Sequence, residues 1–344
     1  MSYTIQSSEK TKSIGSDFET KALLYLMNFR DDSHEIHYFV IDFFNDLTGL
    51  DRLSNKSWDL QSKAAKKNFQ GDIGKELVTL YKNYSSSFSF DHYILFLGGI
   101  ADSIRLDNSK NIFDICNIKS QSLTKIENSL LKECIKKTYI TAEKASLTEI
   151  KKFLTRVIFV IDDKEKSEYI KSIIKVNPLI IPSDTVLEQI FNQIRDVQSS
   201  KKNNNMVEGI VLQTKDEFIF YNRHLTNQEI KMMVLNRIIN NNILQRGVTP
   251  SFIPVFNRIP ATEQKDMLED CQHSIARTIF DKNNSENFWN LFNDIYEIIT
   301  SNKTLSIDLA YRLVNRELLE KLPFLNMISV IYFMAVIKDG IYDN

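Results

Sequence analysis

The sequence predicts an α/β N-terminal part followed by an all-helical C-terminal part. Apolar, β-branched runs alternate with amphipathic helical stretches over roughly the first 195 residues, which is typical of an α/β sheet. Beyond that region, helical spacing of apolar residues dominates. Only nine Gly and six Pro occur among 344 residues, which favours long helices. The polar run Ser199–Asn205 marks a linker, so we expect domains at 1–200 and 206–344.

The first elements are a helix and two strands. Ser16 is a predicted helix N-cap, and Glu19 completes a capping box before an apolar stripe that ends at Phe29. The predicted strands, 36–44 and 58–63, are rich in aromatic and β-branched residues. Between them, Thr48-Gly49 and Asn55-Lys56 supply turn chemistry.

The elements that follow alternate between helix and strand. Up to residue 195 we expect a helix at Gly71–Tyr84, a strand at His92–Leu97, helical structure at 122–154, a buried parallel strand at 156–161, a helix near 164–175 and a short apolar run at 179–181. A short β element at 209–221 precedes predicted helices at 226–245, 261–280, 284–300, 305–320 and 322–338.

Charge and cysteine usage restrict the functional classes. The 43 basic and 44 acidic residues give a net charge of −1, so any contact with nucleic acid must come from local clusters. Cys116, Cys134 and Cys271 are odd in number and widely spaced, which argues against a disulfide framework and a structural zinc site and fits a reducing cytoplasm. Leu322–Ile337 has 16 residues, whereas a membrane span takes about 20. We therefore expect a cytoplasmic protein without membrane contact.

Four residues carry the predicted chemistry: Asp46, Gln61, Lys63 and Glu19. Asp46 ends the first apolar run, and Gln61 and Lys63 lie two apart on the second, so on a strand both project to the same face. Mg2+ prefers hard oxygen ligands and keeps several waters. The predicted ligands are Asp46, the side-chain oxygen of Gln61 and Glu19 on the preceding helix, with the Ser62 carbonyl as an addition and Mn2+ as a substitute ion. Lys63 would orient water or neutralise the transition state.

These motifs resemble a nuclease family. The Asp-x14-Gln-x-Lys spacing resembles the Mrr-type branch of the PD-(D/E)xK nucleases, in which Gln replaces the usual acid. More closely, the double-stranded DNA endonuclease domain of bacterial cyclic-oligonucleotide-based anti-phage effectors is similar in three segments: Asp17-Phe18-Glu19, Phe44–Gly49 and Trp58–Lys63. The resemblance covers about residues 1–200. It implies a restriction-endonuclease-like fold, with the core order helix–strand–strand–helix–strand, and Mg2+-dependent cleavage of double-stranded DNA in anti-phage defence.

The sequence departs from that family in one respect. Those endonucleases tend to have a second acid near the first strand, whereas here Asn45 stands beside Asp46 and Asp42 lies four residues earlier. If Asp42 is out of reach, Glu19 alone supplies the second charge. The alternative function is a non-catalytic interaction subunit of a defence complex that uses a degenerate nuclease fold as a scaffold.

The lysines near the predicted site and the helical domain each allow more than one interpretation. Lys63, Lys66 and Lys67 either contact phosphates that flank the cut or form a solvated charged face, while Lys201-Lys202 is interpreted as a solubilising pair in the linker. The resemblance does not reach the helical domain, whose counterpart in those effectors senses a ligand. Sensing of an activating ligand, oligomerisation and docking of a partner protein therefore all remain open for this part.

Overall fold

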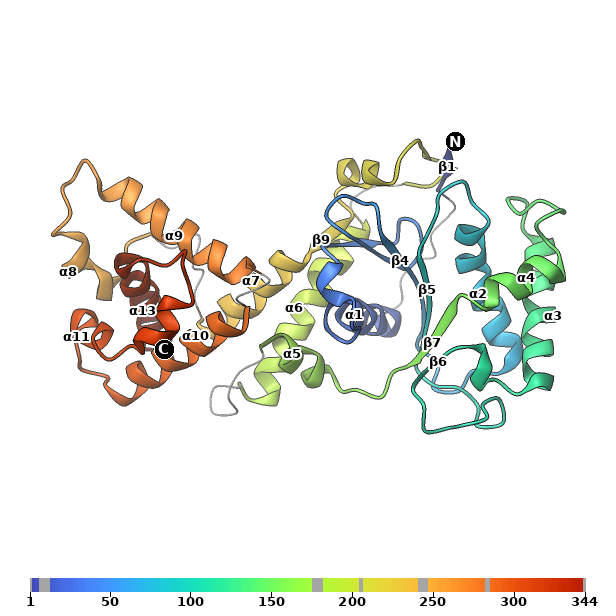
Figure 1. Ribbon diagram of the computed structural model, residues 1–344, viewed down its shortest axis with the longest axis horizontal. Helices are drawn as coiled ribbons and strands as arrows, with labels where there is room; N and C mark the ends of the chain where they lie inside the picture. Colours follow the sequence, from blue (N-terminus) through green and yellow to red (C-terminus); the bar gives the residue numbers. More distant parts are fainter. Residues whose placement is uncertain are drawn as a thin grey trace. The chain divides into compact units, whose positions relative to one another are not determined.

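The computed structural model describes residues 2–5, 13–174, 182–203, 207–240, 247–281 and 285–342. Its contacts divide the chain into two compact units, which we call unit 1 (residues 1–169 and 191–227) and unit 2 (residues 170–190 and 228–344). Unit 1 is mixed α/β and the described part of unit 2 is helical (Figure 1). The predicted division into an α/β part and a helical part is therefore confirmed.

Unit 1 is built on a mixed seven-stranded sheet in the order β6-β7-β5-β4-β3-β2-β9. Three strands, β2, β3 and β4, form an antiparallel meander, whereas β5 and β7 run parallel to β4. The bounds are Tyr38–Ile41 for β2, Leu47–Leu50 for β3, Ser57–Lys63 for β4, His92–Leu97 for β5, Ile112–Phe113 for β6, Val157–Ile161 for β7 and His224–Thr226 for β9.

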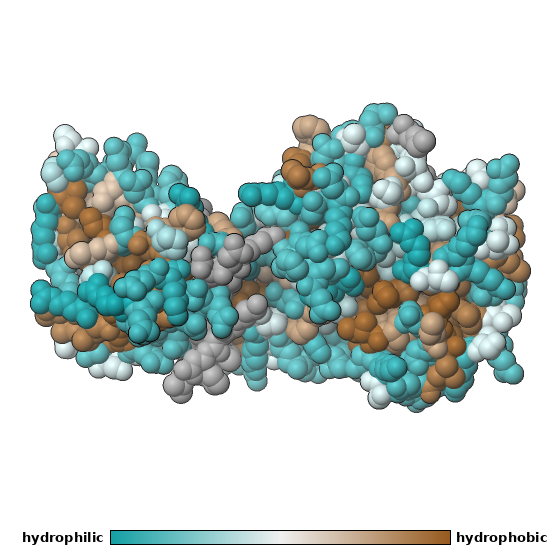
Figure 2. All heavy atoms as spheres, in the orientation of Figure 1, coloured by the Kyte–Doolittle hydropathy of each residue, from teal (hydrophilic) through white to brown (hydrophobic). Residues whose placement is uncertain are grey.

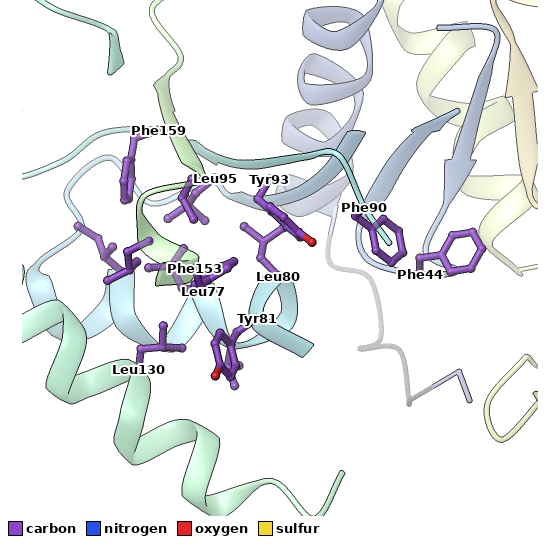
Figure 3. Packing of buried hydrophobic residues seen from close by; sticks show 14 of the residues in the cluster. Phe44, Leu77, Leu80, Tyr81, Phe90, Tyr93, Leu95, Leu130, Phe153 and Phe159 are labelled. Carbon is purple, nitrogen blue, oxygen red and sulfur yellow. The ribbon is translucent and has the colours of Figure 1, made fainter. Parts of the chain in front are cut away.

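Helices cover both faces of this sheet (Figure 1). One face carries α1 (Ser13–Asn28) and α6 (Asp184–Asn203), and the other carries α2 (Gln70–Tyr84), α3 (Ser120–Lys136) and α4 (Leu147–Leu154). Figure 3 shows Leu77 of α2 packed in one cluster with Tyr93 of β5, Leu130 of α3 and Phe153 of α4. Burial on this face fixes the rotation of α2 about its axis.

The start of the sheet corrects two predictions. Residues 47–50 form strand β3, although Thr48-Gly49 was predicted to be a turn. Gly49 fits the strand because its missing side chain leaves room for Ile36, whose Cγ2 would lie 3.1 Å from an added Cβ. The predicted N-cap Ser16 lies inside α1, which begins at Ser13.

Later elements differ in extent. The predicted helical stretch 122–154 is split into α3 and α4, and residues 209–221 form β8 (Val211–Leu212), paired with β1 (Tyr3–Thr4), and the 3-10 helix η3 (Lys215–Tyr221). Residues 199–203 are the last turn of α6, not part of a linker. The run 179–181 and residues 204–206 lie outside the described residues.

Unit 2 packs its helices around α13 (Met327–Tyr342), where residues 329–337 are all buried. Tyr332 of this helix contacts Phe252, with ring centroids 5.2 Å apart. The predicted helix 305–320 is divided into two. The remaining helices are α5 (Lys166–Ile174, shared with unit 1), α7 (Asn227–Ile238), η4 (Pro250–Phe252), α8 (Ile253–Phe256), α9 (Gln264–Phe280), α10 (Ser285–Ser301), α11 (Ile307–Tyr311) and α12 (Arg316–Glu320).

The surface and the cysteines agree with the bulk composition. Figure 2 shows a mainly hydrophilic face on unit 1, with apolar residues gathered near the end that carries β5, β6 and β7. Leu106 and Ile112 are exposed large apolar side chains in the segment around β6. All three cysteines are free. Within the described ranges, every helix is too short or too polar to cross a membrane.

Candidate active site

The turn between β2 and β3 presents two carboxylates. Asp42 adopts a left-handed backbone conformation, with φ 46°, and its N–H donates to the carbonyl of Asp46 at 3.0 Å. The carbonyl of Phe44, between them, accepts hydrogen bonds from Lys82 Nζ at 2.9 Å and Asn83 Nδ2 at 3.2 Å. The turn is therefore held from α2, and Asp46 stands at the start of β3.

The carboxylate of Asp46 lies against β4. Leu47 pairs with Leu60 in the antiparallel register, so residue 46 reaches the next residues of β4. Asp46 Oδ2 accepts from Gln61 Nε2 and from both the backbone N–H and the hydroxyl of Ser62, each at 2.9 Å. Two of the sequence-predicted site residues, Asp46 and Gln61, are thus in direct contact.

A row of polar contacts joins one face of β4 to one face of α2. Alternate strand residues face α2, and helix residues three and four apart face the strand. The pairs, which we call the strand–helix ladder, are Lys63 with Glu76 (Nζ to Oε1, 2.6 Å), Gln61 with Thr79 (Oε1 from Oγ1, 2.7 Å) and Asp59 with Asn83 (Oδ2 from Nδ2, 2.8 Å).

Four of these six residues, Asp59, Glu76, Thr79 and Asn83, were not predicted as site residues from the sequence. Glu76, Thr79 and Asn83 stand at positions i, i+3 and i+7 of α2, a spacing that defines one helical face. A polar stripe on a helix that must cover a sheet is a signal that would have identified them. Because Gln61 and Lys63 both contact this face of α2, they share a face of β4, as their two-residue spacing predicts.

Lys63 is the most accessible member of the ladder. Its side chain is 45% exposed, compared with 20% for Glu76. The segment that follows β4 carries Lys66 and Lys67, which are also exposed. An ammonium at the end of β4 can therefore meet a large anionic ligand from solvent while remaining paired to the protein.

Asp59 is a buried charge behind the site. It is fully buried and accepts from Asn83 at 2.8 Å and from Thr48 Oγ1 at 3.4 Å. Burial raises the pKa of Asp59 and lowers the pKa of Lys82, and each of the two charges opposes the shift of the other. Lys82 donates to the carbonyl of Phe44 in the β2–β3 turn, and Asp59 accepts from Thr48 in β3, so both side chains stabilise this part of the chain.

Glu19 approaches from α1. Burial raises the pKa of the Glu19 carboxyl to about 7; the Lys202 ammonium opposes this shift, and the carboxylates of Asp46 and Asp42 increase it. Lys202 Nζ lies 3.4 Å from Glu19 Oε1 and 3.8 Å from Asp42 Oδ2. Arg223 also contacts Asp42, at 3.6 Å. All three carboxylates thus influence one another electrostatically.

Lys202 corrects a sequence interpretation. Its side chain is only 10% exposed and faces two carboxylates, so it is not a solubilising residue in a linker. Asp42, which the sequence left uncertain, belongs to the same cluster of charges. The sequence could not reveal either placement because α6 lies about 160 residues from the β2–β3 turn.

The donors around Asp46 suit a hard divalent cation. Carboxylate, amide and backbone carbonyl oxygens are the ligands that Mg2+ and Mn2+ prefer. In the parts of the chain that the structure describes, no group of three or more His, Cys, Asp and Glu is arranged to hold a metal ion. The predicted cation site at Asp46 would instead have to include neutral oxygen ligands from Gln61 and the Ser62 carbonyl.

Comparison of the chain with models of protein families, with curated proteins and with solved structures finds no match. The resemblance to PD-(D/E)xK nucleases therefore depends on the three short motifs, and membership of that family stays a prediction. Any assignment of function must be argued from the site itself.

Proposed function

We propose that unit 1 is a Mg2+-dependent endonuclease that cleaves double-stranded DNA. The observation that carries this proposal is the contact of Asp46 with Gln61 and Ser62, with Lys63 on the same face of β4. The element order α1, β2, β3, β4, α2, β5 supports the restriction-endonuclease-like fold, with β3 added to the expected order.

The cation would be held by Asp46, Gln61 and the Ser62 carbonyl, with Glu19 as the second carboxylate. When bound, Mg2+ polarises the phosphate and lowers the pKa of the attacking water. Glu19 must lose its proton to serve as a ligand. Because its pKa is about 7, this step takes place near neutral pH.

The Gln61 amide must turn for its oxygen to become a ligand. At present Nε2 faces Asp46, and Oε1 accepts from Thr79. The Thr79 hydroxyl also lies 3.2 Å from the Glu76 carbonyl. Once the amide turns, Thr79 can donate to that carbonyl and accept from Gln61, so no hydrogen bond is lost there. Without a cation, Gln61 Oε1 would be repelled by Asp46, so cation binding and amide rotation are coupled.

Lys63 supplies positive charge where negative charge develops. A fixed ammonium beside the phosphate stabilises the transition state more than the ground state. Its pairing with Glu76 restricts the side chain before substrate binds. Lys66 and Lys67 are both exposed. They would contact phosphates of the DNA strand on either side of the cleaved bond.

The choice of double-stranded DNA and the role in bacterial anti-phage defence, in the cytoplasm, rest on the family resemblance. Unit 2 would respond to an activating ligand or a partner protein of the defence system. Nuclease activity that must stay off until infection needs such a control, and the described part of unit 2 contributes no residue to the contacts of Asp46, Gln61 or Ser62 given above.

The proposal is tested by cleavage of supercoiled and linear plasmid DNA with Mg2+, Mn2+ or EDTA. Wild-type protein should cleave with either cation and not with EDTA. Asp46→Asn keeps the shape of the side chain but removes its charge, and cleavage should be lost. Asp102→Asn is the matched control, because Asp102 is 86% exposed in a loop after β5; this variant should cleave at the wild-type rate.

Two results would contradict the proposal. One is equal cleavage by wild-type protein and Asp46→Asn. The other is no cleavage of duplex DNA, single-stranded DNA or RNA with either cation, in the presence of extract from phage-infected cells as a source of activator. The second result would favour the non-catalytic scaffold.

A further inference from the structure

Lys202 is a fixed cation within a group of carboxylates. Its ammonium lies 3.4 Å from Glu19 and 3.8 Å from Asp42, and all three side chains are at most 15% exposed. An ammonium held by two largely buried carboxylates occupies a position that a metal ion with oxygen ligands could otherwise take. It comes from α6, whereas the carboxylates come from α1 and the β2–β3 turn.

The last turns of α6 are anchored, so this placement is not a chance contact of a long side chain. Gln198 accepts a hydrogen bond from Thr20 at 2.8 Å and is 2% exposed. Ser199 Oγ lies 2.9 Å from Ser16 Oγ. Thr20 and Ser16 flank Glu19 on α1. Three residues of α6, namely Gln198, Ser199 and Lys202, therefore contact one stretch of α1, and these contacts direct Lys202 toward Glu19.

We infer that Lys202 takes the place of a second divalent cation, so that the site binds one metal ion at Asp46 and uses a protein ammonium between Glu19 and Asp42. With Glu19, Asp42, Asp46 and Asp59 ionised, the cations Lys202, Arg223 and Lys82 leave one net negative charge. One divalent cation reverses that sign. A second divalent cation would then face a positive site, which is unfavourable in a partly buried environment.

The inference rests on the proposed function only for the position of the first cation. It makes a prediction about stoichiometry that does not depend on cleavage. Removing the Lys202 charge while keeping its apolar stem, as in Lys202→Met, leaves Glu19 without the ammonium at 3.4 Å, while Arg223 and Lys82 still act on Asp42. A second divalent ion can then enter.

The experiment is a titration of the full chain with Mn2+. Calorimetry measures the heat of binding, and electron paramagnetic resonance measures the concentration of unbound Mn2+. Wild-type protein should bind one Mn2+ per chain and Lys202→Met two. Lys202→Arg keeps the charge and should bind one. Lys201→Met is the matched control on the adjacent residue, whose ammonium contacts Asn222 at 2.6 Å, and it should also bind one. Circular dichroism establishes that each variant is folded.

The double variant Glu19→Gln, Lys202→Met locates the added ion, because it should return to one Mn2+. Equal stoichiometry and affinity in wild-type protein and Lys202→Met would overturn the inference, as would two ions in the wild type. Cleavage by the wild type with loss in Asp46→Asn would show in either case that the proposed function stands. No Mn2+ binding by any variant would overturn both the inference and the metal site of the proposed function.

Discussion

Asp46 and Gln61, fifteen residues apart in the sequence, are joined by a hydrogen bond of 2.9 Å from Gln61 Nε2 to Asp46 Oδ2. The contact exists because β3 and β4 are antiparallel neighbours and Asp46 comes immediately before β3. A carboxylate and an amide this close together can bind one cation between their oxygens, once the amide has turned and the hydrogen bond between them is broken.

Lys63→Ala should lower the rate of DNA cleavage by about 10²–10³, because it removes a charge that stabilises the transition state. The melting temperature should change little, since a partly exposed ion pair contributes about 1 kcal/mol or less. Plasmid cleavage under single-turnover conditions and thermal unfolding measure the two effects. Lys132→Ala, at an exposed lysine of α3 that has no role in the proposed site, is the control and should cleave at the wild-type rate. Cleavage by Lys63→Ala at the wild-type rate would remove Lys63 from the catalytic site.

Gln61→Glu should make the protein more dependent on cations. A carboxylate oxygen would replace Nε2 at 2.9 Å from Asp46, so the two charges repel each other in EDTA. Added Mg2+ relieves this repulsion and is bound more tightly than by the wild type. Each tenfold gain in affinity adds about 1.4 kcal/mol to the stability in excess Mg2+.

Thermal unfolding in EDTA and in excess Mg2+ measures this difference. Gln61→Glu should melt below the wild type in EDTA and show the larger rise when Mg2+ is added. Gln193→Glu, on an exposed position of α6, controls for the added charge and should show no extra rise. If the rise is the same in Gln61→Glu and the wild type, Gln61 is not next to the cation.

Local patterns were sufficient for part of this structure. The two-residue spacing of Gln61 and Lys63 is a strand property, and the apolar stripe of α2 is a helix property, so both could be inferred from residues near in sequence. The position of Asp46 relative to Gln61 required only that two successive strands pair. The sequence predicted that strands 36–44 and 58–63 pair directly, which is wrong. Residues 47–50, interpreted as a turn because Gly49 is a frequent turn residue, form β3 between β2 and β4.

The surroundings of the site depend on contacts that no local pattern encodes. Lys202 reaches Glu19 across 183 residues, and Arg223 reaches Asp42 across 181. The first contact follows from the packing of α6 against α1, and the second from the pairing of β9 with β2. Polar residues that become buried by packing, such as Asp59, resemble surface residues in the sequence. Their importance emerges only when the partner, here Asn83, is known.

Glu19→Gln should change the pH dependence of stability. The folded protein keeps the Glu19 proton up to a pKa of about 7, whereas the unfolded chain loses it near 4.5. The folded state therefore binds more protons between these values, and its stability falls as pH rises through this window. Relative to the wild type, the variant should gain stability from pH 5 to 7, by at most about 1 kcal/mol per pH unit, with no further gain above.

Asp17→Asn, on the same helix, is a control of opposite sign. Burial alone would raise the pKa of Asp17, but hydrogen bonds from Lys166 and Arg195 outweigh it and lower the pKa. Asp17 thus stabilises the folded state at neutral pH and loses this effect as pH falls below its usual range. Urea unfolding in EDTA from pH 2.5 to 8 should show the change for Asp17→Asn below about pH 4 and the change for Glu19→Gln, of opposite sign, between about pH 5 and 7. Parallel trends would show that the environment of Glu19 is not the one described.

Two glycines of α2 should respond oppositely to alanine. At Gly71 an added Cβ meets nothing within 4 Å, so Gly71→Ala should stabilise the protein by up to about 1 kcal/mol because alanine restricts the unfolded chain. At Gly74, one turn later, the added Cβ would lie 2.5 Å from Ser129 Cβ and 2.8 Å from the Ile126 carbonyl of α3. Gly74→Ala should therefore destabilise by about 1–3 kcal/mol. Since α2 carries Glu76 and Thr79, the displaced helix should also weaken Mn2+ binding, which calorimetry measures. Unchanged stability in Gly74→Ala would mean that α2 and α3 do not pack this closely.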